Sequence, residues 1–271
     1  LAAPSVTVGQ GDPVITIELT PYEGNPVIRH GEPGAWDSAL WYSRVIYHNG
    51  QFHMLYHAYD GTDVVIGYAT SEDGLNWVPY EDNPVLKSDP ILGKIPGLTG
   101  IMIEGDTWVL YLCSGPYVGT TCDVLYRATA PDPTATWTID PEPILEKGAA
   151  GDWDYPQFFP GSFLKTDDGY KMYFHAQNYT GFGMATSPDG IAWTKYDDPA
   201  TTEGKYAASD PVMTTGTSSG SWDARGIAYP IVGRRDEGFE MFYFAPGGIG
   251  YAMSEDGINW SRHSANPVFT T

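Results

Sequence analysis

Three aspartates lie at matching places along the chain and are the strongest candidates for chemistry. Each one ends a Gly-x-Trp-Asp segment: Trp36-Asp37, Trp153-Asp154 and Trp222-Asp223. Glycoside hydrolysis needs two carboxylates, one as general acid and one as nucleophile or base. An aspartate repeated at strand entrances also suits a structural role, as an acceptor of backbone N–H groups. Both interpretations stay open at this point.

A second group of side chains departs from the local repeat or carries polar and planar groups near these acids. Planar rings together with guanidinium, imidazole and amide groups are typical of a sugar-binding surface. His57 and His175 occupy equivalent positions, and they suit ligand contact and a satisfied interior site about equally. The predicted substrate-binding residues are Trp41, Tyr42, Arg44, His57, Tyr155, Gln157, His175, Asn178 and Arg225.

The cysteines and the remaining acids predict neither a metal site nor a cofactor. Cys113 and Cys122 do not have zinc-ligand spacing, and they predict either a disulfide across a hairpin mouth or two buried thiols. Asp60 and Asp63 flank a loop that would suit Ca²⁺, but acidic turns of this kind are usually only solvated. The sequence therefore predicts no resident metal and no cofactor.

A recurring segment predicts the elements that must position these residues. The pattern Ala-Thr/Met-Ser-x-Asp-Gly-x-x-Trp, or a close variant of it, appears four times, at 67–77, 126–137, 183–193 and 250–260. Each copy is followed by a Pro-hydrophobic stop, and a fifth stop, Asn25-Pro26-Val27-Ile28, precedes the first copy. Asn49-Gly50 between two alternating runs predicts a hairpin. Four short strands in each unit of just under 60 residues predict all-β propeller blades, plus an N-terminal strand at about 13–28.

The Ser-x-Asp-Gly-x-x-Trp turns resemble the Asp-box turns of sialidase propellers. Asp73, Asp189 and Asp256 are expected to accept turn N–H groups, and the following glycine tolerates positive φ. A tryptophan closes each copy and is expected to hold the outer strand. These residues recur in nearly every unit, so we predict that their role is structural.

The net charge of the chain limits the classes of partner that it can bind. Lys and Arg number 14 against 34 Asp and Glu, giving a net charge of −20. Such a surface repels nucleic acid and anionic membranes, whereas neutral glycans remain suitable partners. No apolar run approaches the roughly 20 residues that span a bilayer. The acidity and the two cysteines favour a secreted protein, and the oligomeric state is left open.

Taken together, these motifs make the chain resemble the propeller glycosidases of the arabinanase, levansucrase and invertase superfamily. The stops, the Asn49-Gly50 hairpin and the Asp-containing turns carry the resemblance over most of the chain. It implies a single propeller domain over 1–271 of the five-bladed type, although four full repeats are countable. The segment 153–160, Trp-Asp-Tyr-Pro-Gln-Phe-Phe-Pro, resembles the one that holds the general acid in invertases.

The resemblance assigns the general acid to Asp154, with Asp replacing the family's Glu. The family's nucleophile would fall at Trp41 and its transition-state-stabilising Asp at Leu98, neither of which is an acid. The expected function is therefore an extracellular glycoside hydrolase that uses Asp154 with Asp37 or Asp223. The alternative is a noncatalytic carbohydrate-binding propeller that lacks the family's acids.

Overall fold

The described part of the chain is built from β-strands. The computed structural model describes residues 22–59, 61–93, 97–115, 122–176, 178–217 and 220–270. Within these ranges the strands form four antiparallel sheets, and the only helix is a short 3-10 turn at Gly204–Tyr206. The all-β prediction is confirmed. Residues 13–21 of the predicted N-terminal strand lie outside the described residues, as does Asp60 of the predicted Ca²⁺ loop.

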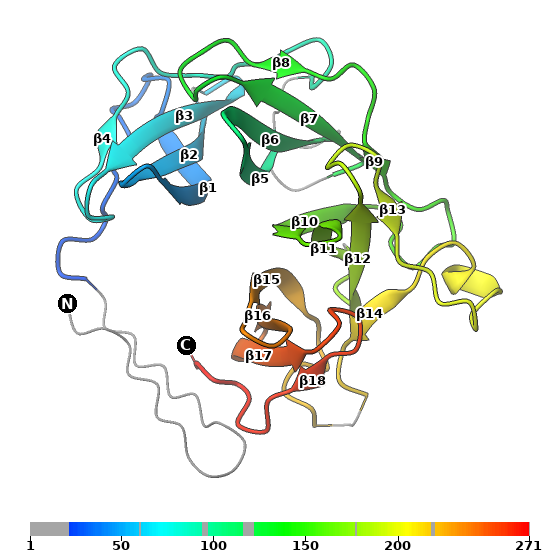
Figure 1. Ribbon diagram of the computed structural model, residues 1–271. Coiled ribbons are helices and arrows are strands. Elements are labelled where there is room, and N and C mark those ends of the chain that lie inside the picture. The colour runs from blue at the N-terminus through cyan, green and yellow to red at the C-terminus, as the bar shows by residue number, and fades with distance from the viewer. Residues whose placement is uncertain are drawn as a thin grey trace. The chain divides into compact units, whose positions relative to one another are not determined.

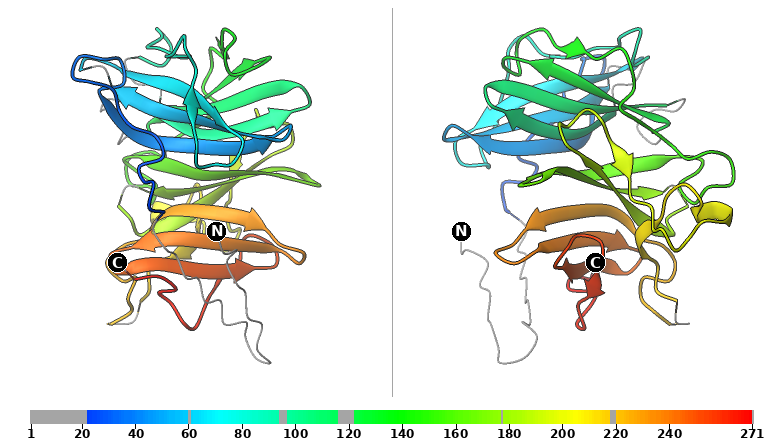
Figure 2. Two further views of the ribbon diagram at one scale, coloured as in Figure 1. Left: turned by 90° about the vertical axis from the view of Figure 1, so that its left-hand side faces the viewer. Right: turned by 45° about the vertical axis from the view of Figure 1, so that its right-hand side comes forward.

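Each sheet is one sequence repeat with its strands in chain order, as Figures 1 and 2 show. Blade 1 contains β1 (Ala39–His48), β2 (Gln51–Tyr59), β3 (Val64–Ser71) and β4 (Val78–Pro79). Blade 2 contains β5 (Gly97–Glu104), β6 (Thr107–Ser114), β7 (Val124–Ala130) and β8 (Thr138–Ile139), with β9 (Leu145–Glu146) pairing with β7.

The second half of the chain repeats this plan. Blade 3 contains β10 (Phe158–Thr166), β11 (Gly169–Ala176), β12 (Gly181–Ser187) and β13 (Thr194–Lys195), with β14 (Pro211–Thr214) pairing with β12. Blade 4 contains β15 (Ala228–Arg234), β16 (Phe239–Ala245), β17 (Gly248–Ser254) and β18 (Ser261–Arg262). The described residues thus form four blades of four strands each, with a fifth short strand added in blades 2 and 3, and the fifth blade that the resemblance implied is not among them.

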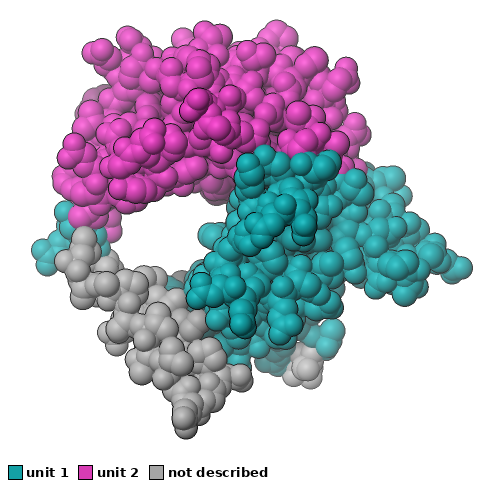
Figure 3. Space-filling model, viewed as in Figure 1, with its two compact units in different colours: residues 1–23, 148–188, 194–271 teal, residues 24–147, 189–193 magenta. Residues whose placement is uncertain are grey.

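The chain divides into two compact units, coloured separately in Figure 3. Unit 2, residues 24–147 and 189–193, holds blades 1 and 2, with β1 against β5. Unit 1 includes residues 148–188 and 194–271 and holds blades 3 and 4, with β10 and β11 against β15. That residues 1–271 make one domain stays a prediction.

The predicted turns are present. Asn49 and Gly50 join β1 to β2 with positive φ angles of 49° and 81°, which suits a two-residue hairpin. In the first Asp-containing turn, Asp73 Oδ1 accepts the N–H groups of Leu75 and Asn76, both at 2.8 Å. Asp189 and Asp256 do the same in their own turns. These aspartates are structural, as predicted.

The two cysteines form a disulfide, which decides between the two alternatives left open by the sequence. Cys113 is the last residue but one of β6, the second strand of blade 2, and Cys122 lies two residues before β7, the third. Their Cα atoms are 4.9 Å apart. The bridge therefore ties β6 to β7 at the end where the two strands are joined.

All four first strands carry a β-bulge near their beginning. The register shifts between Leu40 and Ser43 in β1, and between Leu98 and Gly100 in β5. It shifts again between Pro160 and Ser162 in β10, and between Ala228 and Ile231 in β15. A bulge inserts an extra residue into the ladder and re-aims its side chain. The bulges of β1 and β15 contain aromatic residues.

Candidate functional site

Asp154 lies in the loop before β10 and is fully buried. Its Oδ2 is 2.5 Å from the ammonium nitrogen of Lys195, which belongs to the fourth strand of the same blade. A Cβ at Gly148 would overlap Asp154 Oδ1, so that glycine leaves room for the carboxylate. The resemblance assigned the general acid to Asp154, but no solvent reaches its carboxylate in this structure.

Asp223 has the same surroundings in blade 4. It is fully buried, and its Oδ2 accepts a hydrogen bond from Arg262 Nε at 2.8 Å. Burial by itself raises the pKa of Asp223, but hydrogen bonds from Ser221 and Arg262 and the charge of Arg262 lower the pKa overall. A glycosidase general acid needs a raised pKa, so Asp223 has the opposite electrostatics.

The strand register explains which blades have a buried aspartate paired with a cation of their fourth strand. Lys195 and Arg262 pair with Ala185 and Ala252, and the same position is Pro79 in blade 1 and Ile139 in blade 2. Blades 3 and 4 have both acid and cation, and blade 2 has neither. Blade 1 has the acid without the cation, and Asp37 is partly exposed. Near it, burial and, to a smaller extent, the negative charge of Asp37 raise the pKa of Tyr56 to about 12.

The two predicted binding histidines are buried and hold neighbouring blades together. His57 is 3% exposed, and its Nε2 accepts the backbone N–H of Leu98 in β5 at 2.6 Å. His175 is 1% exposed, and its Nδ1 accepts the backbone N–H of Tyr229 in β15 at 3.3 Å. Each histidine thus bonds the first strand of the next blade through an unprotonated nitrogen. Of the two roles left open by the sequence, the structure shows the interior one.

We expect acid to destabilise the protein through His175. Burial lowers its pKa to about 3, against 6.5 for an ordinary histidine. Below about pH 6.5 the unfolded chain binds the extra proton and the folded protein does not. The contribution of His175 to stability is therefore complete above about pH 6.5 and declines toward pH 3, by at most about 1.4 kcal/mol per pH unit.

Urea unfolding between pH 7 and pH 4 measures this effect. His175→Gln keeps an acceptor but does not titrate, so its unfolding free energy should fall less steeply with acidity than that of the wild type. His30→Gln, at an exposed histidine, is the matched control and should keep the wild-type slope. An unchanged slope in His175→Gln would contradict the assignment.

Beside His175, two tyrosines present their rings to solvent. Tyr179 is 44% exposed and Tyr229 is 45% exposed. The ring centroid of His175 is 5.6 Å from that of Tyr179, in a stacked arrangement, and 4.9 Å from that of Tyr229, edge to face. Phe159 stacks on His175 at 4.9 Å. We call Phe159, His175, Tyr179 and Tyr229 the His175 cluster.

Both tyrosines have backbone angles that non-glycine residues rarely adopt. The φ of Tyr179 is 57° and that of Tyr229 is 54°. Such residues persist only where surrounding contacts hold them, and they concentrate at ligand sites. Here Ile227 N–H donates to Tyr179 O at 2.8 Å, and a Cβ at Gly226 would lie 3.1 Å from that of Tyr179. The fold tolerates backbone strain at the two positions where these rings are exposed.

The other predicted residues of unit 1 divide between surface and interior. Tyr155 is 41% exposed, and Arg225 is exposed too. Gln157 is buried, at 6%. Asn178 Nδ2 donates to the carbonyl of Trp153 at 3.0 Å, which is a structural role. Tyr179 and Tyr229 were not predicted, because a positive φ at a tyrosine leaves no sequence signal.

In unit 2 the bulge of β1 presents Trp41 and Tyr42, each 45% exposed. Trp41 stacks on Tyr59 with ring centroids 5.6 Å apart, and Tyr42 lies edge to face on His57. Arg44 turns inward instead: its Nε donates to the carbonyl of Thr99 at 2.8 Å, and burial lowers its pKa. Trp41 and Tyr42 thus form a second exposed aromatic pair, and Arg44 links β1 to β5.

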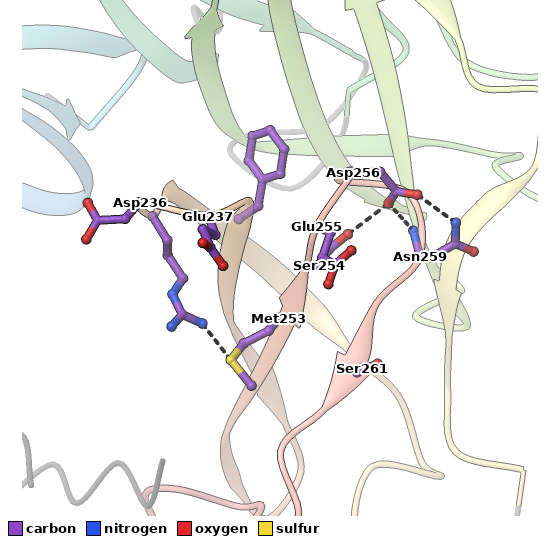
Figure 4. Close-up of a pocket in the computed structure, with 10 residues that line it drawn as sticks. Asp236, Glu237, Met253, Ser254, Glu255, Asp256, Asn259 and Ser261 are labelled. Atoms are coloured by element: carbon purple, nitrogen blue, oxygen red, sulfur yellow. Dashed lines mark hydrogen bonds between the residues drawn. The ribbon is translucent and has the colours of Figure 1, made fainter. Parts of the chain in front are cut away.

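Blade 4 also has an acidic hollow of about 1070 Å³, shown in Figure 4. Asp236, Glu237, Glu255 and Asp256 line it together with Arg235. Asp256 is engaged by its own turn, where burial alone raises its pKa but hydrogen bonds from Asn259 and Ile258 bring the pKa below its usual range. No group of three or more potential metal ligands occurs among the described residues. No helix in the described ranges is long and apolar enough to cross a membrane.

Solved structures of glycoside hydrolases share this fold. One comes from work on the GH130 family of mannoside phosphorylases, which contains glycoside hydrolases that target beta-1,2 mannosidic linkages in Candida mannan. It has a TM-score of 0.67 and 21% identity, covering 89% of this chain and 78% of that one. A putative glycoside hydrolase from Bacteroides ovatus has a TM-score of 0.68 and 20% identity, covering 92% and 82%.

A family 117 glycoside hydrolase of the marine bacterium Zobellia galactanivorans has a TM-score of 0.61 and 21% identity, covering 82% of this chain and 68% of that one. No family model and no curated protein matches the sequence. The resemblance to propeller glycosidases is therefore confirmed as a likeness of fold. At these identities the likeness concerns the fold alone.

Proposed function

We propose that this protein binds carbohydrate outside the cell through its exposed aromatic rings, on a scaffold shared with glycoside hydrolases. The observation that carries the proposal is the contrast within unit 1. Asp154 and Asp223 are fully buried and neutralised by cations of their own blades, whereas the rings of Tyr179 and Tyr229 face solvent. Exposed rings suit the apolar faces of sugars, and a buried ion pair suits no reacting glycosidic bond.

Other properties support the same ligand and location. The net charge of −20 favours a neutral glycan over nucleic acid or an anionic membrane. The Cys113–Cys122 disulfide is of the kind that persists in oxidising surroundings such as the extracellular space. Tyr155 and Arg225 are exposed residues of unit 1 that would add stacking and hydrogen bonding.

The second candidate function is glycoside hydrolysis, favoured by the likeness of fold to hydrolases. In that mechanism Asp154 would act as general acid, with Asp37 or Asp223 as nucleophile or base. Asp37 is the only one of the three that is partly exposed, and blade 1 has Pro79 where blades 3 and 4 have their cations. Hydrolysis through Asp154 would require its ion pair with Lys195 to open.

A binding experiment tests the first candidate. Titration calorimetry with neutral oligosaccharides should show Tyr179→Ala and Tyr229→Ala each weakening binding by about tenfold, the equivalent of about 1.4 kcal/mol. Tyr47→Ala is the matched control, because Tyr47 is 61% exposed but lies toward the far end of β1 from the bulge. Affinity unchanged in both variants of the His175 cluster would contradict the proposal.

Hydrolysis assays on the same oligosaccharides and on aryl glycosides separate the two candidates. Wild type beside Asp154→Asn is the decisive comparison. Turnover by the wild type that disappears in a folded Asp154→Asn protein would assign the chemistry to Asp154. Binding without turnover is the result expected here.

A further inference from the structure

A cleft of about 400 Å³ lies between blades 1 and 2, within unit 2. Its walls include His48, His53, Tyr68, Asp106, Trp108 and Asp132. His48 ends β1, whereas the exposed pair Trp41 and Tyr42 stands near the start of the same strand. At about 3.3 Å per residue along β1, the two places are about 20 Å apart. The cleft is therefore separate from that aromatic pair.

Among the described residues that line the cleft there are two carboxylates but no lysine or arginine. Asp106 and Asp132 are both exposed. Hydrogen bonds from Thr134 hold the pKa of Asp132 below its usual value, so this carboxylate is ionised at neutral pH. Burial lowers the pKa of His53, so its ring is uncharged at neutral pH. The walls thus carry negative charge that no lysine or arginine of the walls balances.

His53 is held in place by its neighbours and offers the cleft no positive charge. Its Nε2 is 3.3 Å from the carbonyl oxygen of His48, which can only accept, so Nε2 carries the proton and donates. Nδ1 then accepts the hydroxyl proton of Tyr68 at 2.6 Å. The imidazole also lies edge to face on Trp108, with ring centroids 5.0 Å apart. Both nitrogens of His53 are therefore engaged within the wall of the cleft.

The strand register shows that His53 has the place that a lysine has in unit 1. His53 pairs with Thr70, and Lys171 pairs with Thr186. Each threonine immediately precedes the serine of the Asp-containing turn of its blade, so the two positions are equivalent. Each side chain also lies against an aromatic ring of the blade that follows.

Lys171 places its ammonium group among the same kinds of side chain that line the cleft. Its Nζ lies over the ring of Phe239, 5.8 Å from the centroid. Phe239 and Trp108 are equivalent, because each pairs with the residue two before the turn aspartate of its blade, Asp256 or Asp132. Burial lowers the pKa of Lys171, and the charge of Asp256 opposes that shift. Unit 1 therefore has a cation of its own at the place that is a cleft in unit 2.

We propose that this cleft binds a small organic molecule through a protonated primary amine, whose ammonium group takes the place that Lys171 Nζ has in unit 1. Ammonium groups are attracted to aromatic rings and to carboxylates, which Trp108 and Asp132 supply. The volume of the cleft falls within the roughly 300–1,000 Å³ of small-molecule sites. Alkylamines and amino sugars both present this group. The site does not depend on carbohydrate binding at the His175 cluster.

Titration calorimetry at pH 7 and constant ionic strength tests the site with n-butylammonium and glucosamine, and with n-butanol as the neutral control. The wild type should bind at least one of the amines, which identifies the source, and should not bind n-butanol. Asp132→Asn keeps the Oδ1 acceptor of its turn but not the charge, so it should weaken amine binding at least tenfold. Asp73→Asn, the same change in the turn of blade 1, should leave the affinity unchanged. Equal weakening by both variants, wild-type affinity in Asp132→Asn, or no amine binding to the wild type would overturn the proposal.

A substitution at His53 gives a second test, because it supplies the cation that unit 1 has. His53→Lys should abolish amine binding, since its own ammonium group would occupy the cleft, whereas the neutral His53→Gln should retain it. Both variants should bind neutral oligosaccharides as the wild type does, so failure of the amine site and failure of carbohydrate binding are distinguishable. Wild-type amine affinity in His53→Lys, or an equal loss of amine binding in both variants, would contradict the proposed site.

Discussion

Replacing Asp154 with alanine is expected to lower the free energy of unfolding by about 3–5 kcal/mol. The reason is the Lys195 ammonium, which is left in a largely buried place, 13% exposed, without its counter-charge. Breaking one half of a buried pair costs far more than removing both halves. Chemical denaturation at pH 7 gives the value directly.

Two further variants separate this structural role from a catalytic one. Lys195→Met should destabilise the protein to a similar extent, whereas Asp154→Leu combined with Lys195→Met should recover much of the loss. A surface pair provides the control: Arg234→Ala, whose partner Asp167 is 88% exposed, should change stability by less than about 1 kcal/mol. An Asp154→Ala protein of wild-type stability would contradict the buried-pair account.

The tryptophan that precedes Asp154 is expected to matter as much to stability. Trp153→Ala should cost about 3–5 kcal/mol, because it removes a large side chain from a site that is 2% exposed. The indole stacks on Phe174 with ring centroids 5.8 Å apart, and its N–H donates to Ser209 Oγ at 3.0 Å. Trp153→Phe, which keeps a ring in place, should cost less.

The Phe174 ring that stacks on Trp153 also packs against Gly183, so a substitution at Gly183 tests this packing independently by thermal or chemical denaturation. A Cβ at Gly183 would overlap the Phe174 ring, so Gly183→Ala should destabilise by about 1–3 kcal/mol through overpacking. Gly233→Ala is the matched control in β15, where an added Cβ would lie 3.7 Å from Glu240, an ordinary contact. Equal effects of Gly183→Ala and Gly233→Ala would mean that the Phe174 ring leaves room for the added methyl group, which would contradict the prediction.

Most of the fold could be predicted from the sequence because its signals are local and repeated. Asn49-Gly50 fixes a hairpin within a few residues, and the Asp73 turn closes on its own backbone. The role of the Trp-Asp segments could not be predicted in this way. The partner of Asp154 is 41 residues further along the chain, and only the strand register brings Lys195 to it.

Aligning the four repeats does reveal one sequence signal for the buried ion pairs. The cation stands two residues after the turn tryptophan in blades 3 and 4, as Lys195 and Arg262, and these blades also have the buried acid. Blade 2 has Ile139 at this position and no acid. The exposed tyrosines of the His175 cluster have no such signal, because the φ angles of Tyr179 and Tyr229 depend on contacts with other segments.

The bulges in the first strands separate the exposed aromatic residues that we propose bind ligand from the residues that hold the strand register. Bulge residues stand outside the regular cross-strand register, so the side chains of Trp41, Tyr42 and Tyr229 can be exchanged without shifting the ladder beside them. The tryptophan stack and the ion pair that we expect to stabilise the fold involve other residues: Trp153 on Phe174, and Asp154 with Lys195. Substitutions confined to these few positions would therefore alter the proposed binding surface while leaving the strand register of blades 1 and 4 unchanged.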